Sequence, residues 1–140
     1  FNKEINLILV GSGPELEKIK ELSSFVSKNI KIDVKGFVSD AERLELYKLA
    51  DYNIVPTLAL EGFGLVVIEA GLLGCPSIVT NVDALPEVVR NTPNSHIYRN
   101  NAELKSILLN LKKLNNEEII DVKDFFNSEY GLNDSYNLVS

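Results

Sequence analysis

The 140-residue sequence has no methionine and no tryptophan, and it contains only one cysteine and one histidine. A single cysteine excludes an internal disulfide and fits a reducing compartment. Because Cys75 lies among apolar neighbours in LLGCPSIV, we interpret it as a buried small thiol rather than a nucleophile. With His96 as the only histidine, the sequence predicts neither a His-based metal site nor a Ser-His-Asp triad. The first residue is Phe1, so we expect a fragment of a longer protein.

Basic residues are also scarce. Lysine and arginine total 14 against 20 acidic residues, which gives a net charge of −6. Nucleic-acid grooves need clustered basic side chains, and no such cluster occurs, so no nucleic-acid partner is predicted. The sequence shows no apolar run long enough to span a membrane and no secretory signal. We therefore expect a cytoplasmic location, with the full-length protein placed peripherally at the inner face of a membrane as one option.

The hydrophobic periodicity alternates between short apolar strands and amphipathic helices. Near-continuous apolar strands separated by helices are typical of a parallel sheet covered on both faces. We predict an α/β fold with a doubly wound, Rossmann-like parallel sheet, one domain over residues 1–140, and a loose tail over 129–140. The expected strands are Ile5–Val10, Ile30–Val34, 51–56, 76–80 and 95–98. The first three expected helices run from Pro14 to Val26, from Ser39 onward and from Gly64 onward. The other three are a short helix around Leu85–Val89 and helices over Ala102–Leu114 and Glu117–Phe126.

Ligands of such sheets bind beyond the carboxyl ends of the strands, so the loops there are the candidate sites. The loop GSGP (Gly11–Pro14) places Gly11 and Gly13 before a helix, where backbone N–H groups can approach an anion. It lacks the third glycine of a dinucleotide fingerprint, and a plain tight turn is the more common explanation. The loops 36–40 and 80–87 occupy equivalent positions.

The segment EGFGLVVIEAG gives the strongest signal. Gly62 and Gly64 flank Phe63 where a helix must begin, which leaves the first-turn N–H groups and the positive end of the helix dipole open to an anion. Glu69 follows Glu61 by eight residues, and a carboxylate can accept two hydrogen bonds from a vicinal diol. The alternatives are a structural Glu69 that pairs with a basic group or a backbone, a solvated Glu61, and a Phe63 that only packs.

These residues resemble the signature of the retaining nucleotide-sugar glycosyltransferases of family 4, which have the two-lobed GT-B fold. The E-x7-E hallmark of that family is matched at Glu61 and Glu69, and the flanking blocks LILVGSGPELEKIKEL, VKGFVSDAERLELYKLADYNIVP and ALPEVV agree in order. The resemblance spans about Ile5 to Val89. It implies the C-terminal, donor-binding lobe of such an enzyme, which transfers a sugar from a nucleotide-diphosphate sugar to a sugar, lipid-linked or glycan acceptor with anomeric retention.

The resemblance also implies roles for individual residues. Glu61 would orient the transferred sugar, and Glu69 would hold the ribose hydroxyls. The remaining donor contacts that it implies are the backbone of Gly62, Phe63, Gly64 and Leu65 at the helix start, Val38 at the nucleobase, and Asp40 and Arg43 near its rim. For Asp40 and Arg43 a first-turn carboxylate and a solvated helix residue are the better explanation. No metal and no cofactor are expected, and no general base is assignable.

The sequence departs from the family in several places. The basic pair that helps the diphosphate leave, the first strand of the lobe and the acceptor lobe have no counterpart here, so we expect the isolated chain to be inactive. Asp83 and Ala84 stand where the family often has two glycines, and NSHIYRN lacks a usual glycine. Two alternatives stay open: a sugar-nucleotide epimerase of the same architecture and a non-catalytic partner lobe. A response-regulator-like or other doubly wound binding domain would need an acidic cluster after its first strand, and LILVGSG offers none.

Overall fold

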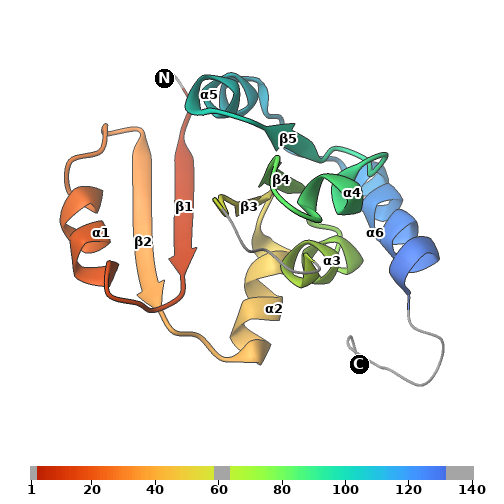
Figure 1. Cartoon of the computed structure of the whole chain (residues 1–140), viewed down its shortest axis with the longest axis horizontal. Coiled ribbons are helices and arrows are strands. Elements are labelled where there is room, and N and C mark those ends of the chain that lie inside the picture. The colour runs from red at the N-terminus through yellow and green to blue at the C-terminus, as the bar shows by residue number, and fades with distance from the viewer. Residues whose placement is uncertain (1–2, 59–63, 132–140) are drawn as a thin grey trace. The chain divides into compact units, whose positions relative to one another are not determined.

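The computed structural model describes residues 3–58 and 64–131. The chain forms two compact units, Phe1–Arg43 and Leu44–Ser140. Strands and helices alternate along both units, as Figure 1 shows by colour from red to blue. All of the strand pairs are parallel, which confirms the predicted α/β, Rossmann-like class. Each unit has its own paired strands, two in the first unit and three in the second.

The N-terminal unit contains β1 (Ile5–Val10), α1 (Leu16–Ser23) and β2 (Ile30–Gly36). Ile5 pairs with Ile30 and the register continues to Leu9 and Val34, after which it shifts. Alternate residues of both strands are half-buried and the residues between them are exposed. This alternation fits a two-stranded sheet that α1 covers on one face. Helix α2 (Asp40–Leu49) begins at the end of this unit.

The C-terminal unit contains β3 (Asn53–Val55), β4 (Ser77–Thr80) and β5 (His96–Tyr98), with β4 in the centre. Every residue of β4 is buried, as expected for a central parallel strand with both faces covered. The helices are α3 (Leu65–Leu72), α4 (Leu85–Val89), α5 (Asn101–Asn110) and α6 (Asn116–Tyr130). The core of this unit consists of the apolar residues Val55, Val67, Leu72, Val79, Leu85, Val88, Val89, Leu114, Val122 and Phe126.

Helix α6 packs on α3 (Figure 1). A side chain at Gly71 would overlap the ring of Phe126, and one at Gly74 would come within 2.7 Å of Ile119. Gly71 therefore permits α3 and α6 to approach closely, and the fully buried Phe126 fills the space. The two contacts also fix the direction: the end of α3 meets the beginning of α6, so the helices are antiparallel.

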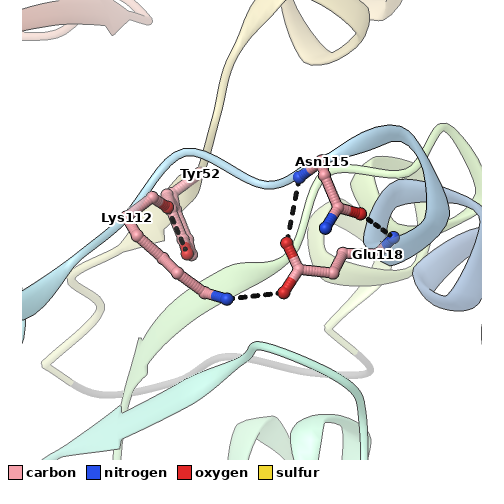
Figure 2. A network of polar contacts seen from close by, with 4 residues as sticks. All are labelled: Tyr52, Lys112, Asn115 and Glu118. Carbon is pink, nitrogen blue, oxygen red and sulfur yellow. Dashed lines mark hydrogen bonds and ion pairs between the residues drawn. The ribbon is translucent and has the colours of Figure 1, made fainter.

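A polar network holds the connection between α5 and α6 (Figure 2). The Tyr52 hydroxyl donates to the Lys112 carbonyl at 3.0 Å, and the Lys112 Nζ donates to Glu118 at 2.6 Å. The Asn115 N–H donates to the second carboxylate oxygen of Glu118, and the Glu118 N–H donates to the Asn115 side chain, each at 2.9 Å. Asn115 and Glu118 thus form a capping box that begins α6.

The predicted elements are all present, with different ends for some of them. α1 ends at Ser23 rather than Val26, because the hydroxyls of Ser23 and Ser24 bond back to the carbonyls of Lys20 and Glu21 and compete with the continuing helix. α5 ends at Asn110 rather than Leu114, because Leu111 is extended. The predicted cap of α2 is present, since the Glu42 N–H donates to Ser39 Oγ at 3.1 Å.

Candidate functional site

The beginning of α3 is the part of the E-x7-E segment that the structure describes, from Gly64 onward. Gly64 stands before the helix with φ +67, a left-handed conformation that favours glycine. A β-carbon there would also lie 3.2 Å from Val88 Cγ2. The Gly64 carbonyl accepts from the N–H groups of Val67 and Ile68, so the preceding N–H groups of this turn have no acceptor inside the helix. The left-handed φ and the closeness of Val88 explain why glycine stands at this position, and its donor contact stays a prediction. Glu61, Gly62 and Phe63 lie outside the described residues.

Helix α3 has a core face and an outer face. Val67, Ala70 and Gly71 are buried, whereas Leu65 is 61% exposed and Glu69 is half-buried. Glu69 is one turn beyond Leu65, so both residues belong to the outer side of the helix. Glu69 also makes an interaction within the chain, so a bound hydroxyl would add to that interaction or replace it.

Hydroxyl groups that were not predicted from the sequence tie together the ends of β3 and β4. Thr80 Oγ1, at the end of β4, donates to the Thr57 carbonyl at 2.5 Å and thereby holds the chain after β3. At the other end of the same strands, Asn53 Nδ2 donates to Ser77 Oγ at 3.1 Å. Thr80 and Ser77 are both buried. The sequence does contain a signal for these two bonds: Ser77 and Thr80 stand at the two ends of a strand that is otherwise apolar. Because buried polar groups require partners, hydrogen bonds from these hydroxyl residues could have been predicted.

The loop between β4 and α4 keeps a glycine-like backbone without glycine. Asp83 has φ +49, and Asp is among the few non-glycine residues that tolerate the left-handed region. Asn94, before β5, has φ +60. At both places where the sequence lacks a glycine usual in the family, an aspartate or an asparagine thus adopts the left-handed conformation that glycine adopts readily. A change of side chain at these positions does not by itself require a change of chain path.

In the N-terminal unit, Gly11 and Gly13 border a cleft of about 320 Å³ at the carboxyl end of β1. The Gly11 N–H donates to the Gly36 carbonyl at 2.7 Å, which ties this loop to the end of β2. The other residues of the cleft are mostly apolar: Leu9, Val10, Ser12, Pro14, Glu15, Leu16, Ile19 and Val34. The donor contacts assigned to Gly11 and Gly13 stay predictions.

Val38, Asp40 and Arg43 follow the end of β2. Val38 is buried, and its predicted backbone contact with a nucleobase stays a prediction. Arg43 Nη1 lies 2.7 Å from Asp40 Oδ1, one helical turn away, and the Asp40 side chain is 91% exposed. This arrangement is that of an acidic first turn with an exposed ion pair, which contributes little to stability. It agrees with the first-turn carboxylate expected at Asp40, whereas the Arg43 side chain is 31% exposed and so only partly solvated. The nucleobase contacts of both residues stay predictions.

Neither Cys75 nor His96 belongs to the first turn of α3. Cys75 is buried, and burial raises the pKa of its thiol to about 12, with a smaller effect from Asp51. Burial lowers the pKa of His96, which stands at the beginning of β5 with its ring centroid 6.4 Å from that of Tyr52. In residues 3–58 and 64–131, no group of three His, Cys, Asp or Glu side chains could hold a metal ion. No helix within these ranges has the length and apolar character needed to cross a membrane.

Comparison with known proteins places these features in a wider group. The profile of the family described as "Glycosyl transferases group 1" matches residues 2–123. An uncharacterised glycosyltransferase of Methanocaldococcus jannaschii is 32% identical over 88 residues, 63% of this chain and 22% of that protein. A phosphatidyl-myo-inositol mannosyltransferase of Mycobacterium leprae is 29% identical over 67% of this chain and 24% of its own length. A GDP-mannose-dependent alpha-(1-6)-phosphatidylinositol monomannoside mannosyltransferase of Mycobacterium tuberculosis is 31% identical over 61% of this chain and 24% of its own length. The chain thus spans about a quarter of the length of these curated relatives.

Proposed function

This chain belongs to the group 1 glycosyltransferases, and we propose that the whole protein transfers a sugar from a nucleotide-diphosphate sugar to an acceptor hydroxyl with retention of anomeric configuration. In this proposal the chain supplies donor-binding groups. The observation that supports it most directly is the beginning of α3. A left-handed glycine there precedes the first-turn N–H groups, and Glu69 stands on the outer side one turn further along.

The donor diphosphate is proposed to bind at the beginning of α3. N–H groups without an intrahelical acceptor and the positive end of the helix dipole favour an anion there. Gly64 has no side chain that would stand between these groups and the ligand. The chain has a net charge of −6, so the attraction comes from local dipoles rather than from the field of the whole chain. We therefore expect weak donor binding unless basic groups from elsewhere in the protein take part.

The two glutamates of the E-x7-E pattern are proposed to bind hydroxyl groups of the donor. Glu69 would accept hydrogen bonds from the ribose diol, and Glu61 would orient the transferred sugar. Ionised carboxylates accept two such bonds and make them stronger than neutral acceptors do. The assignments of Val38, Asp40 and Arg43 to the nucleobase rest on the family resemblance alone and are proposed with it.

Catalysis in this proposal comes from positioning and from stabilising the charge of the departing diphosphate. No side chain of the described residues is assigned as a general base. The α3 N–H groups would face the oxygen on which charge develops, and neither a metal nor a cofactor is required by the proposal. A hydrogen-bond donor that interacts more strongly with the transition state than with the bound substrate lowers the activation barrier. A donor that binds both states equally does not lower it.

The relatives suggest which donor to test first. Two of the proteins compared above carry mannosyltransferase names, and one name specifies GDP-mannose. We therefore propose GDP-mannose as the first donor for binding and turnover measurements, with UDP-glucose as the comparison.

Donor binding is tested by titration of GDP-mannose and UDP-glucose against the full-length protein and three variants. We expect Glu69→Gln and Glu69→Ala to weaken donor binding by about tenfold or more, because a hydrogen bond to a charged group is lost. Glu117→Gln is the matched control, since Glu117 is an exposed carboxylate in the first turn of α6. Equal affinities of the Glu69 variants and the unchanged protein would contradict the ribose assignment.

The reaction type is tested by the stereochemistry of the product. We expect the sugar to appear on the acceptor with the anomeric configuration that it had in the donor, as read from the proton coupling of the anomeric carbon. Inversion would contradict retention. Free epimerised sugar or nucleotide would instead indicate the epimerase.

A further inference from the structure

A second groove lies on the C-terminal unit, between the end of α4 and the end of α6. Its volume is about 320 Å³, and it is lined by Glu87, Arg90, Asn91, Phe125, Glu129 and Tyr130. None of these residues belongs to the donor assignments above. The composition is two half-buried aromatic rings with one exposed guanidinium, one exposed amide and two exposed carboxylates around them.

The aromatic part of the groove is held rigidly. Phe125 packs edge-to-face on Phe126, with the ring centroids 5.6 Å apart, and Tyr130 stacks on the same ring at 5.8 Å. Phe126 is fully buried against Gly71 of α3. Phe125 and Tyr130 thus pack on a fully buried core residue, which restricts their motion, so a ligand would have less side-chain freedom to order on binding.

The polar part of the groove consists of side chains that make few contacts with the rest of the described chain. Within residues 3–58 and 64–131, the side chains of Glu87, Arg90 and Glu129 make no hydrogen bond and no ion pair. Asn91 has φ +68 in a turn that the Thr92 N–H closes on the Val89 carbonyl at 3.0 Å, so its position is set by the backbone. Side chains of both charges therefore line the groove without forming an ion pair with other described residues.

This combination suits an uncharged polyol. Arg90 attracts an anion that Glu87 and Glu129 repel, and the two carboxylates attract a cation that Arg90 repels, so the charges partly offset one another for an ion of either sign. A sugar ring presents hydroxyls that can donate to the carboxylates and accept from the guanidinium and the amide. Its aliphatic C–H face carries partial positive charge and packs on the negative face of an aromatic ring. We propose that this groove binds a segment of an oligosaccharide, as a second carbohydrate site separate from the donor contacts of α3.

The test uses a local reporter in the full-length protein, with Phe125 replaced by 4-fluorophenylalanine. Linear α-linked mannotetraose is titrated, with maltotetraose as a second probe, and the fluorine chemical shift is followed by NMR. The choice of mannotetraose rests on the proposed function, whereas the reporter detects occupation of the groove whether or not a donor binds. We expect a saturable shift with a dissociation constant in the millimolar range for at least one tetrasaccharide.

Variants separate this groove from other sites. We expect Arg90→Gln and Glu129→Gln to weaken the fluorine-detected binding about tenfold, and Glu117→Gln, a carboxylate at the far end of α6, to leave it unchanged. Glu69→Gln should also leave it unchanged while weakening GDP-mannose binding. No saturable shift with either tetrasaccharide, or a shift that Arg90→Gln and Glu129→Gln both leave unchanged, overturns the proposal. Retained donor binding in that case would leave the proposed function standing.

Discussion

The ring of Phe126 occupies the space in which a side chain at Gly71 would stand. Phe126 is 0% exposed and packs on two further aromatic rings of α6, so it has little freedom to withdraw. We expect Gly71→Ala to lower the free energy of unfolding by about 1–3 kcal/mol, because a well-packed contact between two helices must open. Urea denaturation followed by circular dichroism measures the change.

The control for this substitution is Gly13→Ala, where an added β-carbon meets nothing within 4 Å. We expect that change to alter stability by no more than about 0.5 kcal/mol. Phe126→Leu in the Gly71→Ala background should cost less than the two single changes added together, because the smaller side chain relieves the overlap. Strict additivity of the two changes would argue against the contact.

Thr80 links stability to the candidate donor site. Thr80→Val removes the hydroxyl that donates to the Thr57 carbonyl and leaves that carbonyl without this bond. We expect a loss of about 1–2 kcal/mol in the free energy of unfolding, together with weaker donor binding, since the chain after β3 loses a tether.

The matched control is Thr92→Val. Thr92 is also buried, and its hydroxyl donates to the Val89 carbonyl at 2.7 Å, away from the loop after β3. We expect a similar loss of stability with unchanged donor binding. If both variants weaken the donor equally, the effect follows from global stability rather than from the tether.

His96 makes stability depend on pH in one direction. Burial lowers the pKa of His96 in the folded state below its ordinary value of 6.5. Between these two values the unfolded chain binds a proton that the folded chain does not bind. The contribution of His96 is therefore fully favourable above pH 6.5 and declines as the pH falls toward the folded pKa. The difference in free energy of unfolding between the protein and its His96→Gln variant should change with pH in this window. A pH-independent difference would contradict the assignment.

Cys75 should be chemically silent in the folded protein. Its thiol is buried, and a pKa of about 12 leaves almost no thiolate at pH 8. We expect no reaction with Ellman's reagent at that pH until the chain unfolds. A cysteine introduced at the exposed Ser106 of α5 is the positive control and should react at once. Rapid modification of Cys75 in the folded protein would show that the position is more accessible than its burial indicates.

Local patterns predicted most of the fold. The alternation of apolar strands and amphipathic helices predicted the order and type of the elements, and Pro14 and Ser39 marked where α1 and α2 begin, because those signals lie within a few residues of the structure they specify. The glycine at position 64 predicted the helix start of the candidate site for the same reason. Helix ends were less accurate at α1 and α5, where serine hydroxyls and an extended Leu111 stop the helix sooner than the apolar pattern does.

Contacts between distant segments could not be predicted in this way. The bond from Thr80 to Thr57, the overlap that Gly71 avoids with Phe126, and the groove beside Arg90 each join elements that the sequence separates widely. No periodicity records which side chains meet across such distances. Residues 59–63, which include Glu61, lie outside the described structure, so the role of Glu61 rests on the E-x7-E pattern.

The left-handed backbone at Asp83, Asn91 and Asn94 has a consequence for evolution within this family. Each of these positions can exchange among glycine, asparagine and aspartate without altering the path of the chain, whereas a β-branched residue would force the turn to rebuild. An alignment of relatives should therefore show substitution at these three positions confined to that small set, however freely the surrounding side chains vary. Relatives would then differ in the side chains of the loops after β4 while the backbone of these loops keeps the same path.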